Sequence, residues 1–298
     1  MPGNIRWGII GPGRIARKFA LAMSRAEGAE LVAVASRTAA SAEASGGEFS
    51  IPKRYGSYEA LVVDAGVDAV YVATPHPFHL PCAKLCLEAG KPVLCKKPLA
   101  VNAAQAGEMI ALARSRKVFL MEGMWSRFIP AVAKAKQWLG EGRIGELRYL
   151  AADFGFRAPF DPKGRVYNPD LAGGALLDVG IYPISLAHWL LGKPVEIKAT
   201  AHLGPTGVDH ENAVVFKYAN GAQAVLSSAV SAVTIHEAFL SGTQGEIRIH
   251  PAWWCSERST RLDNGKELET CQLPQRHFAH EIEHVGACLR EGRSESPS

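Results

Sequence analysis

The chain has 298 residues, 47% of them hydrophobic and 21% charged, which is enough apolar material for two folded domains and excludes a disordered protein. Its formal net charge is only +4 and its lysines and arginines form no stripe, so we expect no nucleic-acid partner. The sequence begins without the basic, apolar and cleavage regions of a secretory signal, and no stretch reaches the ~18 apolar residues of a membrane span.

Six cysteines occur without a Cys-x-x-Cys pair. The spacing of Cys82 and Cys86 fits one face of a helix, where cysteines behave as small buried hydrophobes. We therefore expect free thiols, a reducing compartment and a cytoplasmic protein with no membrane partner.

Short apolar runs alternate with helical patterns in the first 120 residues. Strands this short and uniformly apolar are typical of a parallel sheet buried on both faces. We therefore predict an α/β domain of the Rossmann type over residues 1–123, with its ligand beyond the carboxyl ends of the strands. The predicted strands are 5–10, 31–35, 69–73, 92–95 and 118–121, and the clearest helices are 15–23, 39–44 and 103–114.

The pattern changes after residue 123. Helical stretches, a long loop and several strand-like runs follow, and the turn pair Asn220-Gly221 separates two of the runs. We predict an α+β domain over residues 124–298 with a mostly antiparallel open sheet. Its predicted helices are 130–139 and 176–191, its unstructured loop is 157–174, and its strands are 147–154, 196–202, 213–218, 223–229, 236–241 and 246–250.

A glycine-rich turn follows the first predicted strand and opens the first helix. Its sequence, Gly-Pro-Gly-Arg-Ile-Ala at 11–16, fits the dinucleotide pattern Gly-x-Gly-x-x-Gly/Ala. Gly11 permits the tight turn and Gly13 lets a pyrophosphate approach the backbone. The amides of Arg14 and Ile15 at the helix N-terminus can then bind the phosphates, and Ala16 lets the helix pack on the strand. The alternative is a plain glycine-rich turn.

The end of the second predicted strand favours NADP over NAD. An NAD enzyme usually has Asp or Glu there for the ribose 2′-hydroxyl, whereas this chain has Ser36 and Arg37. Arg37 attracts a 2′-phosphate and Ser36 can donate a hydrogen bond to it. The alternative for Arg37 is a solvated charge at a helix start.

Two features suggest acid/base chemistry. Lys97 ends a predicted strand, and Asp178 and Tyr182 lie four residues apart, on one face of a predicted helix. A tyrosine beside a lysine can have a lowered pKa and exchange a proton with a hydroxyl or carbonyl while a nicotinamide exchanges hydride. Taken singly, Lys97 would be a surface charge and Tyr182 a core tyrosine.

The sequence resembles the glucose–fructose oxidoreductase and inositol dehydrogenase family, and within it the dimeric dihydrodiol dehydrogenases. The resemblance covers nearly the whole chain. It rests on Trp-Gly-Ile-Ile-Gly at 7–11, Tyr-Gly-Ser-Tyr-Glu at 55–59, Thr-Pro-His-Pro-Phe-His at 74–79, Cys-Lys-Lys-Pro-Leu at 95–99, Met-Glu-Gly-Met-Trp-Ser-Arg-Phe at 121–128, residues 173–182 and Pro-Ala-Trp-Trp-Cys at 251–255.

The resemblance implies an NADP-linked oxidoreductase acting on dihydrodiols, aldopyranoses or dicarbonyl sugars. It implies Lys97 and Tyr182 as the acid/base pair, with Asp178 facing the substrate. It implies aromatic pocket walls at Trp125, Phe154 and Trp254. With the position of the strand ends, it adds further expected cofactor contacts at Thr74, His76, His79, Lys96, Trp125 and Arg127; for the two histidines a structural role is an equal alternative.

Two departures from the family stand out. The family has Glu-Lys-Pro where this chain has Lys96-Lys97-Pro98, and a second cation should make Lys97 easier to deprotonate if the two ammonium groups are close. Family members also continue past a Glu-Ser-Pro, here 295–297, into a further helix that returns to the Rossmann domain, whereas this sequence stops at Ser298.

Residues 280–284 match the zinc-protease pattern His-Glu-x-x-His. Ala287 and Arg290 stand where the metzincin continuation needs Gly and His, so we expect a partly exposed helix face and no metal. Strands with apolar residues on both faces, around Val225, predict an outer sheet face buried in a homodimer, and the resembled family does associate through this sheet. A non-catalytic NADP-binding sensor is the alternative function.

Overall fold

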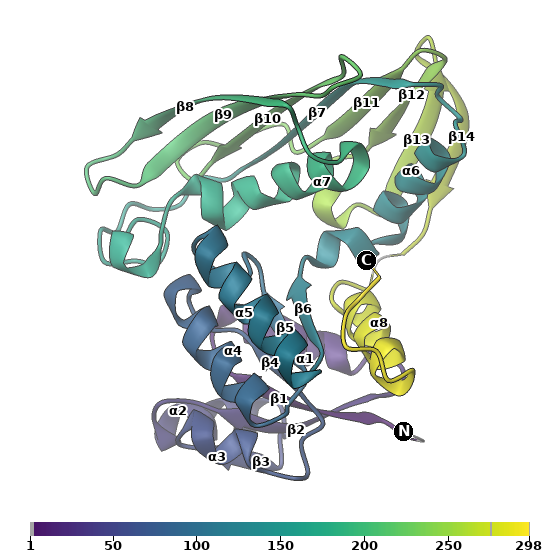
Figure 1. The fold of residues 1–298 in the computed structure, drawn as a ribbon. Coiled ribbons are helices and arrows are strands. Elements are labelled where there is room, and N and C mark those ends of the chain that lie inside the picture. Colours follow the sequence, from purple (N-terminus) through teal and green to yellow (C-terminus); the bar gives the residue numbers. More distant parts are fainter. Residues whose placement is uncertain (1–2, 275, 298) are drawn as a thin grey trace. The chain divides into compact units, whose positions relative to one another are not determined.

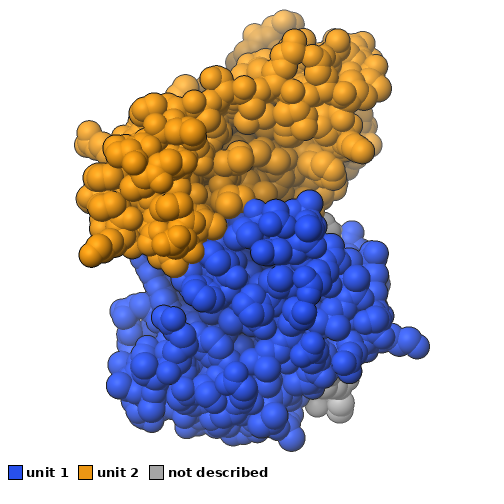
Figure 2. Space-filling model, turned by 60° about the vertical axis from the view of Figure 1, so that its left-hand side comes forward, with its two compact units in different colours: residues 1–125, 276–298 blue, residues 126–275 orange. Residues whose placement is uncertain are grey.

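The computed structural model describes residues 3–274 and 276–297. The chain forms two compact units (Figure 2). Unit 1 comprises Met1–Trp125 and Arg276–Ser298, and unit 2 comprises Ser126–Gln275. The expected domain boundary at residue 123 lies close to the point where the chain first passes from unit 1 to unit 2, after Trp125. Residues 276–298 were expected in the second domain, but they belong to unit 1 because their helix packs there.

Unit 1 is built on a six-stranded parallel sheet with the order β3-β2-β1-β4-β5-β6. This is the strand order of a dinucleotide-binding Rossmann domain. All strands are parallel, but the chain adds strands to one side of β1 up to β3 and to the other side from β4 onward, so the strand order reverses between β1 and β4. The central strands are almost fully buried, as their uniformly apolar sequences predict. The strands are β1 (Ile5–Ile10), β2 (Ala29–Ala35), β3 (Lys53–Tyr55), β4 (Ala69–Val72), β5 (Val93–Lys96) and β6 (Leu120–Gly123).

Helices cover both faces of this sheet (Figure 1). Several begin at the side-chain caps that favour helix starts: Thr38, Ser57 and Asn102 each accept a hydrogen bond from an amide three residues later. The helices are α1 (Arg14–Met23), α2 (Ala39–Glu48), α3 (Tyr58–Val62), α4 (His79–Glu88), α5 (Ala103–Arg116) and α8 (Ala279–Arg290).

The late helix α8 packs against α1 and β2 of unit 1. An aromatic cluster joins them: Phe19 of α1 stacks on Tyr71 with centroids 3.9 Å apart and also meets Trp7 and Phe278. Phe278 in turn lies 4.9 Å from Trp125. This burial of large rings explains why a segment from the end of the chain completes the first unit.

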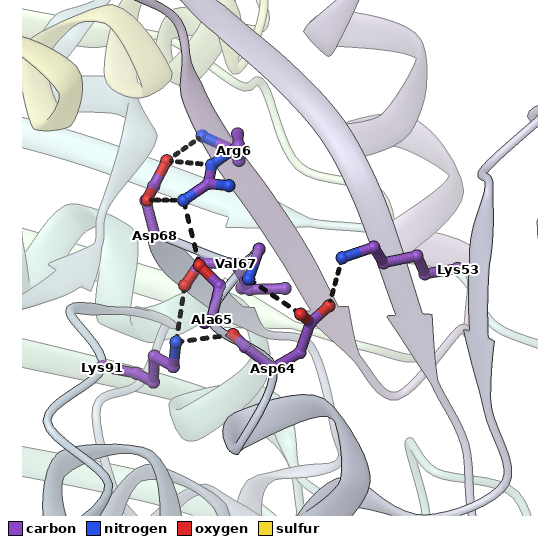
Figure 3. Close-up of polar contacts among 8 residues, drawn as sticks. Arg6, Lys53, Asp64, Ala65, Val67, Asp68 and Lys91 are labelled. Atoms are coloured by element: carbon purple, nitrogen blue, oxygen red, sulfur yellow. Dashed lines mark hydrogen bonds and ion pairs between the residues drawn. The ribbon is translucent and has the colours of Figure 1, made fainter.

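The amino-terminal ends of the unit 1 strands are held together by ion pairs (Figure 3). Arg6 makes two side-chain hydrogen bonds to Asp68, at 2.7 and 2.9 Å, and Lys53 pairs with Asp64 at 2.7 Å. Lys91 donates to the carbonyl oxygens of Asp64 and Val67. These contacts fix the turn before β4. They lie at the amino-terminal ends of the strands, whereas the glycine-rich turn lies at the carboxyl ends.

Unit 2 is built on an eight-stranded sheet with the order β14-β13-β12-β11-β7-β10-β9-β8. All neighbouring pairs are antiparallel except β7 with β10, so the predicted mostly antiparallel sheet is confirmed. The strands are β7 (Leu147–Gly155), β8 (Glu196–Leu203), β9 (Asp209–Lys217), β10 (Gln223–Ala229), β11 (Ala238–Gly242), β12 (Gly245–Ile249), β13 (Arg258–Asp263) and β14 (Lys266–Gln272).

Helices α6 (Pro130–Gly140) and α7 (Ile181–Leu191) lie on the same face of this sheet (Figure 1). The single helix predicted over 176–191 is in fact a π-helical turn, Leu176–Gly180, that continues into α7. The stretch Pro169–Leu191 is long and apolar enough to cross a membrane by length and composition, contrary to the sequence expectation. Half of its most apolar window is buried inside the protein, which is typical of a core helix.

Candidate functional site

The glycine-rich turn of unit 1 lies where the strand order reverses. Gly11 follows β1 with a φ of +85°, and a Cβ there would stand 2.9 Å from Cγ2 of Thr74, which follows β4. Both the left-handed backbone and the close approach require glycine. Gly11 and Thr74 therefore lie in contact at the strand ends where sheets of this order bind their ligands.

The start of α1 fits a dinucleotide phosphate. Gly13 is its N-cap, and apart from its chain neighbours no described residue has a heavy atom within 4 Å of where a Cβ of Gly13 would be. Among the described residues, no side chain caps this helix and no acid occupies its first turn. The amides around Arg14 and Ile15 are thus left for an anion from outside the chain.

The end of β2 carries the two residues expected to select NADP. Ser36 is buried and its amide donates to Tyr55 O at 3.0 Å, which fixes the turn. Arg37 is exposed, and its guanidinium lies 5.9 Å above the ring of Phe78. Thr38, the next residue, caps α2. A cation held at the start of a helix suits a 2′-phosphate, so these residues fit the cofactor that the sequence predicts.

The turn that carries Lys97 is tied down on two sides. Lys97 is 7% exposed. The amide of Leu99 donates to Oε1 of Glu122 at 2.8 Å. His79 sets Nδ1 at 2.8 Å from Pro98 O and Nε2 at 2.9 Å from Thr74 O. The backbone around Lys97 is therefore fixed by β6 and by the first residue of α4.

His79 itself is fully buried. Burial and the charge of Lys96 lower its pKa to about 4 despite its carbonyl neighbours, so its ring is neutral at physiological pH. Each nitrogen lies against a backbone carbonyl, and a neutral ring can donate to only one of the two. His79 is thus enclosed by two turns, which supports the structural alternative over cofactor contact. His76 is also buried, with its ring edge-on to His79 at 5.6 Å.

Trp125 is the last residue of the first segment of unit 1. Its ring lies 4.9 Å from Phe278 and 6.1 Å from His277, at the start of α8. In the same helix Glu281 is fully buried, and its carboxyl makes no hydrogen bond within the described part of the chain. Burial, and then the charge of Glu122, raise the pKa of Glu281 well above its usual value, so its surroundings favour the protonated carboxyl.

Unit 2 supplies an aromatic wall. Phe154 in β7 stacks on Trp254 with centroids 3.4 Å apart and planes 7° from parallel. Tyr182, 7% exposed and in the first turn of α7, lies 5.3 Å from Phe154. These three predicted site residues come together. An apolar wall beside a phenol suits a ring-shaped or partly apolar ligand.

His236 completes this wall and was missed from the sequence, where it was taken as the first residue of a strand. It adopts a φ of +68°, which is uncommon for a non-glycine residue. Its amide donates to Oδ2 of Asp153 at 2.7 Å, and its ring lies edge-on to Phe154 and Trp254. No pattern around it in the sequence indicates this role.

Asp178 lies in the π-helical turn and is 7% exposed. Both of its oxygens accept hydrogen bonds from Arg165, each at 2.9 Å. Arg165 comes from the loop predicted to be unstructured, and sequence reasoning missed it. A π-turn within a helix often marks a functional site.

Arg127, expected to contact the cofactor, lies in unit 2. It donates to Ser185 Oγ at 3.0 Å, and its guanidinium lies 5.5 Å above the ring of Trp189. Lys136 approaches the same ring at 4.0 Å. Arg127 therefore contacts α7 at two places, and its cofactor role stays a prediction.

The zinc-protease pattern forms no metal site. His280 Nε2 accepts a hydrogen bond from Arg276 N, and His284 Nε2 lies 2.8 Å from Ser296 Oγ. Across residues 3–274 and 276–297, no three His, Cys, Asp or Glu side chains gather as a metal ion requires. The helix face that carries His280 and His284 is partly exposed, as the sequence predicts, whereas Glu281 lies on the buried face.

Two family models match the chain. Residues 5–124 match the oxidoreductase family with an NAD-binding Rossmann fold, and residues 132–248 match the GFO/IDH/MocA C-terminal domain. The first range lies in unit 1 and the second in unit 2.

Curated and solved relatives agree. Trans-1,2-dihydrobenzene-1,2-diol dehydrogenase of Mus musculus is 40% identical over 98% of this chain and 90% of its own length, and that of Homo sapiens is 36% identical over the same shares. A mutant of KijD10, a 3-ketoreductase from Actinomadura kijaniata solved with TDP-benzene and NADP, superposes with a TM-score of 0.87 at 29% identity, covering 97% of this chain and 91% of that one. Aldose-aldose oxidoreductase from Caulobacter crescentus, complexed with glycerol, gives 0.89 at 29% identity over 98% and 91%.

Proposed function

Because the chain belongs to the GFO/IDH/MocA family of oxidoreductases, we propose that it is an NADP-linked dehydrogenase or reductase that interconverts a secondary alcohol and a carbonyl in a cyclic diol, polyol or sugar. The observation that carries this proposal is the packing of Tyr182 on the Phe154–Trp254 stack. In this proposal the aromatic wall contacts the apolar face of the substrate ring, and the Tyr182 phenol beside the wall donates or accepts the proton.

Unit 1 binds the cofactor in this proposal. The amides at the start of α1 hold the pyrophosphate, Gly11 and Gly13 let it approach, and Ser36 with Arg37 hold the 2′-phosphate. When bound, NADP supplies the hydride acceptor or NADPH the hydride donor. The known ligand of the KijD10 relative, NADP, supports the choice of cofactor.

Tyr182 takes the proton from the substrate hydroxyl or returns it to the carbonyl oxygen. Lys97 assists by favouring the phenolate, as in the resembled family. Burial on an aromatic wall by itself opposes an anionic phenolate, so Tyr182 needs the charge of a cation to act as an effective base. Asp178 accepts a hydrogen bond from a substrate hydroxyl.

The substrate class follows from the relatives. A dihydrodiol, a 3-keto group and an aldose are implied by the names of the trans-1,2-dihydrobenzene-1,2-diol dehydrogenases, the 3-ketoreductase and the aldose-aldose oxidoreductase. The dihydrodiol and the aldose are rings or ring-forming molecules that carry a hydroxyl or carbonyl next to another hydroxyl. We propose a substrate of this vicinally oxygenated kind.

The proposal includes a cytoplasmic homodimer formed through the outer face of the unit 2 sheet. Val215, Val225, Ala151 and Phe239 face one another across four neighbouring strands, β9, β10, β7 and β11. Val215 and Val225 are 37% and 39% exposed. An apolar row of this kind is more stable when a second copy covers it.

The test is turnover by the purified full-length chain. It is mixed with NADP or NADPH and with trans-1,2-dihydrobenzene-1,2-diol, xylose and other aldoses, and vicinal dicarbonyls, and NADPH absorbance is followed. We expect turnover of at least one substrate. NADPH binding without turnover of any member would contradict the proposal and favour a non-catalytic sensor.

A further inference from the structure

Arg165 and Asp178 form a largely buried ion pair in unit 2. The guanidinium donates from Nη1 to Oδ1 and from Nη2 to Oδ2, both at 2.9 Å, and the two side chains are 28% and 10% exposed. Two parallel bonds fix the plane of a carboxylate as well as its position. Burial lowers the pKa of Arg165, but the hydrogen bonds and charge of Asp178 outweigh burial and raise it. The guanidinium therefore stays charged.

The loop that presents Arg165 is well anchored. Tyr167 is 2% exposed, and its hydroxyl bonds to the carbonyl oxygens of Ala158 and Val230 at 3.1 and 3.0 Å. The amide of Gly174 donates to Val166 O at 2.8 Å. A small apolar cluster that includes Tyr167, Val179 and Val230 lies beneath the loop. Arg165 thus projects from a rigid support rather than from a mobile surface loop.

The backbone of the π-helical turn is held by other groups. Asp209 in β9 accepts the amide of Leu176 at 2.8 Å and the side-chain amide of Asn212 at 2.7 Å. Asn212 in turn accepts a hydrogen bond from Ser228 in β10 at 3.0 Å. Gly174 is required here, because a Cβ would stand 2.2 Å from Oδ1 of Asp209. The turn is therefore fixed to the sheet independently of Arg165.

A buried ion pair is an inefficient way to stabilise a fold, because desolvation offsets the attraction between the charges. What the pair does supply is a carboxylate of fixed charge and orientation. A carboxylate can accept about four hydrogen bonds, so two from Arg165 do not exhaust its capacity. Asp178 lies one turn before Tyr182 in the same helical segment.

We propose that Arg165 is a positioning and selectivity residue: it holds Asp178 as an oriented, anionic acceptor for the substrate hydroxyl next to the reacting carbon. This inference rests on the function proposed above and deepens it. A substrate with that hydroxyl gains a charge-assisted hydrogen bond to Asp178, whereas its deoxy analogue does not. The enzyme therefore selects vicinally oxygenated substrates over simple alcohols and ketones.

The test compares Arg165→Met and Arg165→Lys with the wild type on two substrates. One is the best substrate of the turnover panel, and the other is its analogue without the neighbouring hydroxyl. For Arg165→Met we expect kcat/KM on the hydroxylated substrate to fall roughly 10- to 100-fold, mainly through KM, which is the size of one hydrogen bond to a charged group. On the deoxy analogue the change should stay below about threefold, because that substrate never used the bond.

The pH profile gives a readout that a purely structural role would not move. Without the guanidinium, Asp178 is easier to protonate, so the acid limb of kcat/KM on the hydroxylated substrate should move to higher pH in Arg165→Met. Arg165→Lys keeps the charge but not the two-pronged geometry. It should therefore keep the wild-type acid limb while losing part of the selectivity, and it serves if Arg165→Met folds poorly.

Arg6→Met is the matched control, because Arg6 makes a comparable two-pronged pair with Asp68 at the other edge of the unit 1 sheet. It should change neither selectivity nor the acid limb. Equal losses on both substrates, or an effect confined to substrates that carry an anionic group, would overturn the inference. Such results leave the proposed function standing, whereas absence of wild-type turnover on every substrate would remove the function itself.

Discussion

The rings of Phe154 and Trp254 stack with centroids 3.4 Å apart and planes 7° from parallel. They come from β7 and from the short turn Trp253–Cys255, which Asp153 O anchors by accepting the indole N–H of Trp253 at 2.8 Å. Because Tyr182 packs against Phe154, the stack fixes the phenol as well as the wall. In the proposed reaction, substrate contact and proton transfer are therefore set by one packed aromatic cluster.

The cofactor preference can be inverted at Arg37. Arg37→Glu removes the counter-charge of the 2′-phosphate and offers an acceptor for a ribose hydroxyl, so NADPH should bind more weakly and NADH more tightly. Fluorescence titration of both nucleotides measures this, with the exposed Arg116→Glu in α5 as the control. Equal affinity of the wild type for NADH and NADPH would contradict the assignment of Ser36 and Arg37.

The buried Glu281 should make stability depend on pH. Its folded-state pKa is raised, so its protonated form favours the folded state below the unfolded pKa, and this contribution is lost as pH rises. Glu281→Gln has no such loss. The free energy of unfolding of the variant, relative to that of the wild type, should therefore rise by up to about 1.4 kcal/mol per pH unit once the pH exceeds the unfolded value of about 4.3.

Urea unfolding at several pH values tests this prediction. Glu283→Gln in the same helix is the control with opposite sign. Despite partial burial, the amide of Glu27 and the side chain of Arg276 hold the pKa of Glu283 below its usual value. That variant should lose stability at neutral pH. A constant difference between Glu281→Gln and wild type across the pH range would mean that Glu281 is not protonated in the fold.

The ion pairs at the strand starts should stabilise unit 1 at neutral pH and lose this effect in acid (Figure 3). Hydrogen bonds from Lys53 and from the amide of Gly66 lower the pKa of Asp64 to about 2. A depressed pKa contributes stability above the unfolded value, near 4, and this contribution is lost as pH falls toward about 2.

Asp64→Asn should therefore cost about 1 kcal/mol or less at neutral pH, because Lys53 is 41% exposed and solvent screens the pair. The cost should shrink toward zero near pH 2. Unfolding curves at neutral and acid pH measure it, with Asp263→Asn in the exposed β13–β14 turn as the control. A cost that persists unchanged in acid would point to packing rather than charge.

A charge on the outer sheet face should give monomers. Val225→Asp sets a carboxylate in the row shared with Val215 and Ala151, and burying it against a second copy would be unfavourable. Light scattering should report a dimer for the wild type and a monomer for the variant, with NADPH binding kept. Val63→Asp, at an exposed valine of unit 1, should leave the dimer intact; a monomeric wild type would refute the assembly.

Much of the fold could be predicted because its strands are apolar. The predicted strand 223–229 matches β10, and 5–10 matches β1. The missed strands have the opposite character: β3 has the sequence Lys-Arg-Tyr, and β13 and β14 carry charges throughout. β3 and β14 lie at sheet edges, and β13 is the neighbour of β14. Strands this polar are stabilised by pairing rather than by their own hydrophobicity, so no periodic signal marks them.

The candidate site residues also fall into those that local sequence predicts and those that it does not. Gly11, Gly13 and Arg37 follow strand ends, and such positions can be predicted from local pattern. Arg165 and His236 meet Asp178 and Phe154 only through tertiary contacts, and the π-turn that holds Asp178 depends on Asp209 from a strand far along the chain. Contacts of this kind leave no periodicity in a single sequence.

The central claim is that Tyr182 transfers the proton in an NADP-linked reaction. The most direct test measures two quantities for Tyr182→Phe and the wild type: kcat on the best substrate of the panel, and the dissociation constant of NADPH. The variant loses only the phenolic hydroxyl, so kcat should fall by roughly 10²- to 10⁴-fold, the size of a lost general acid/base, with NADPH binding unchanged. Wild-type kcat in the variant would contradict the claim and assign the proton to another group.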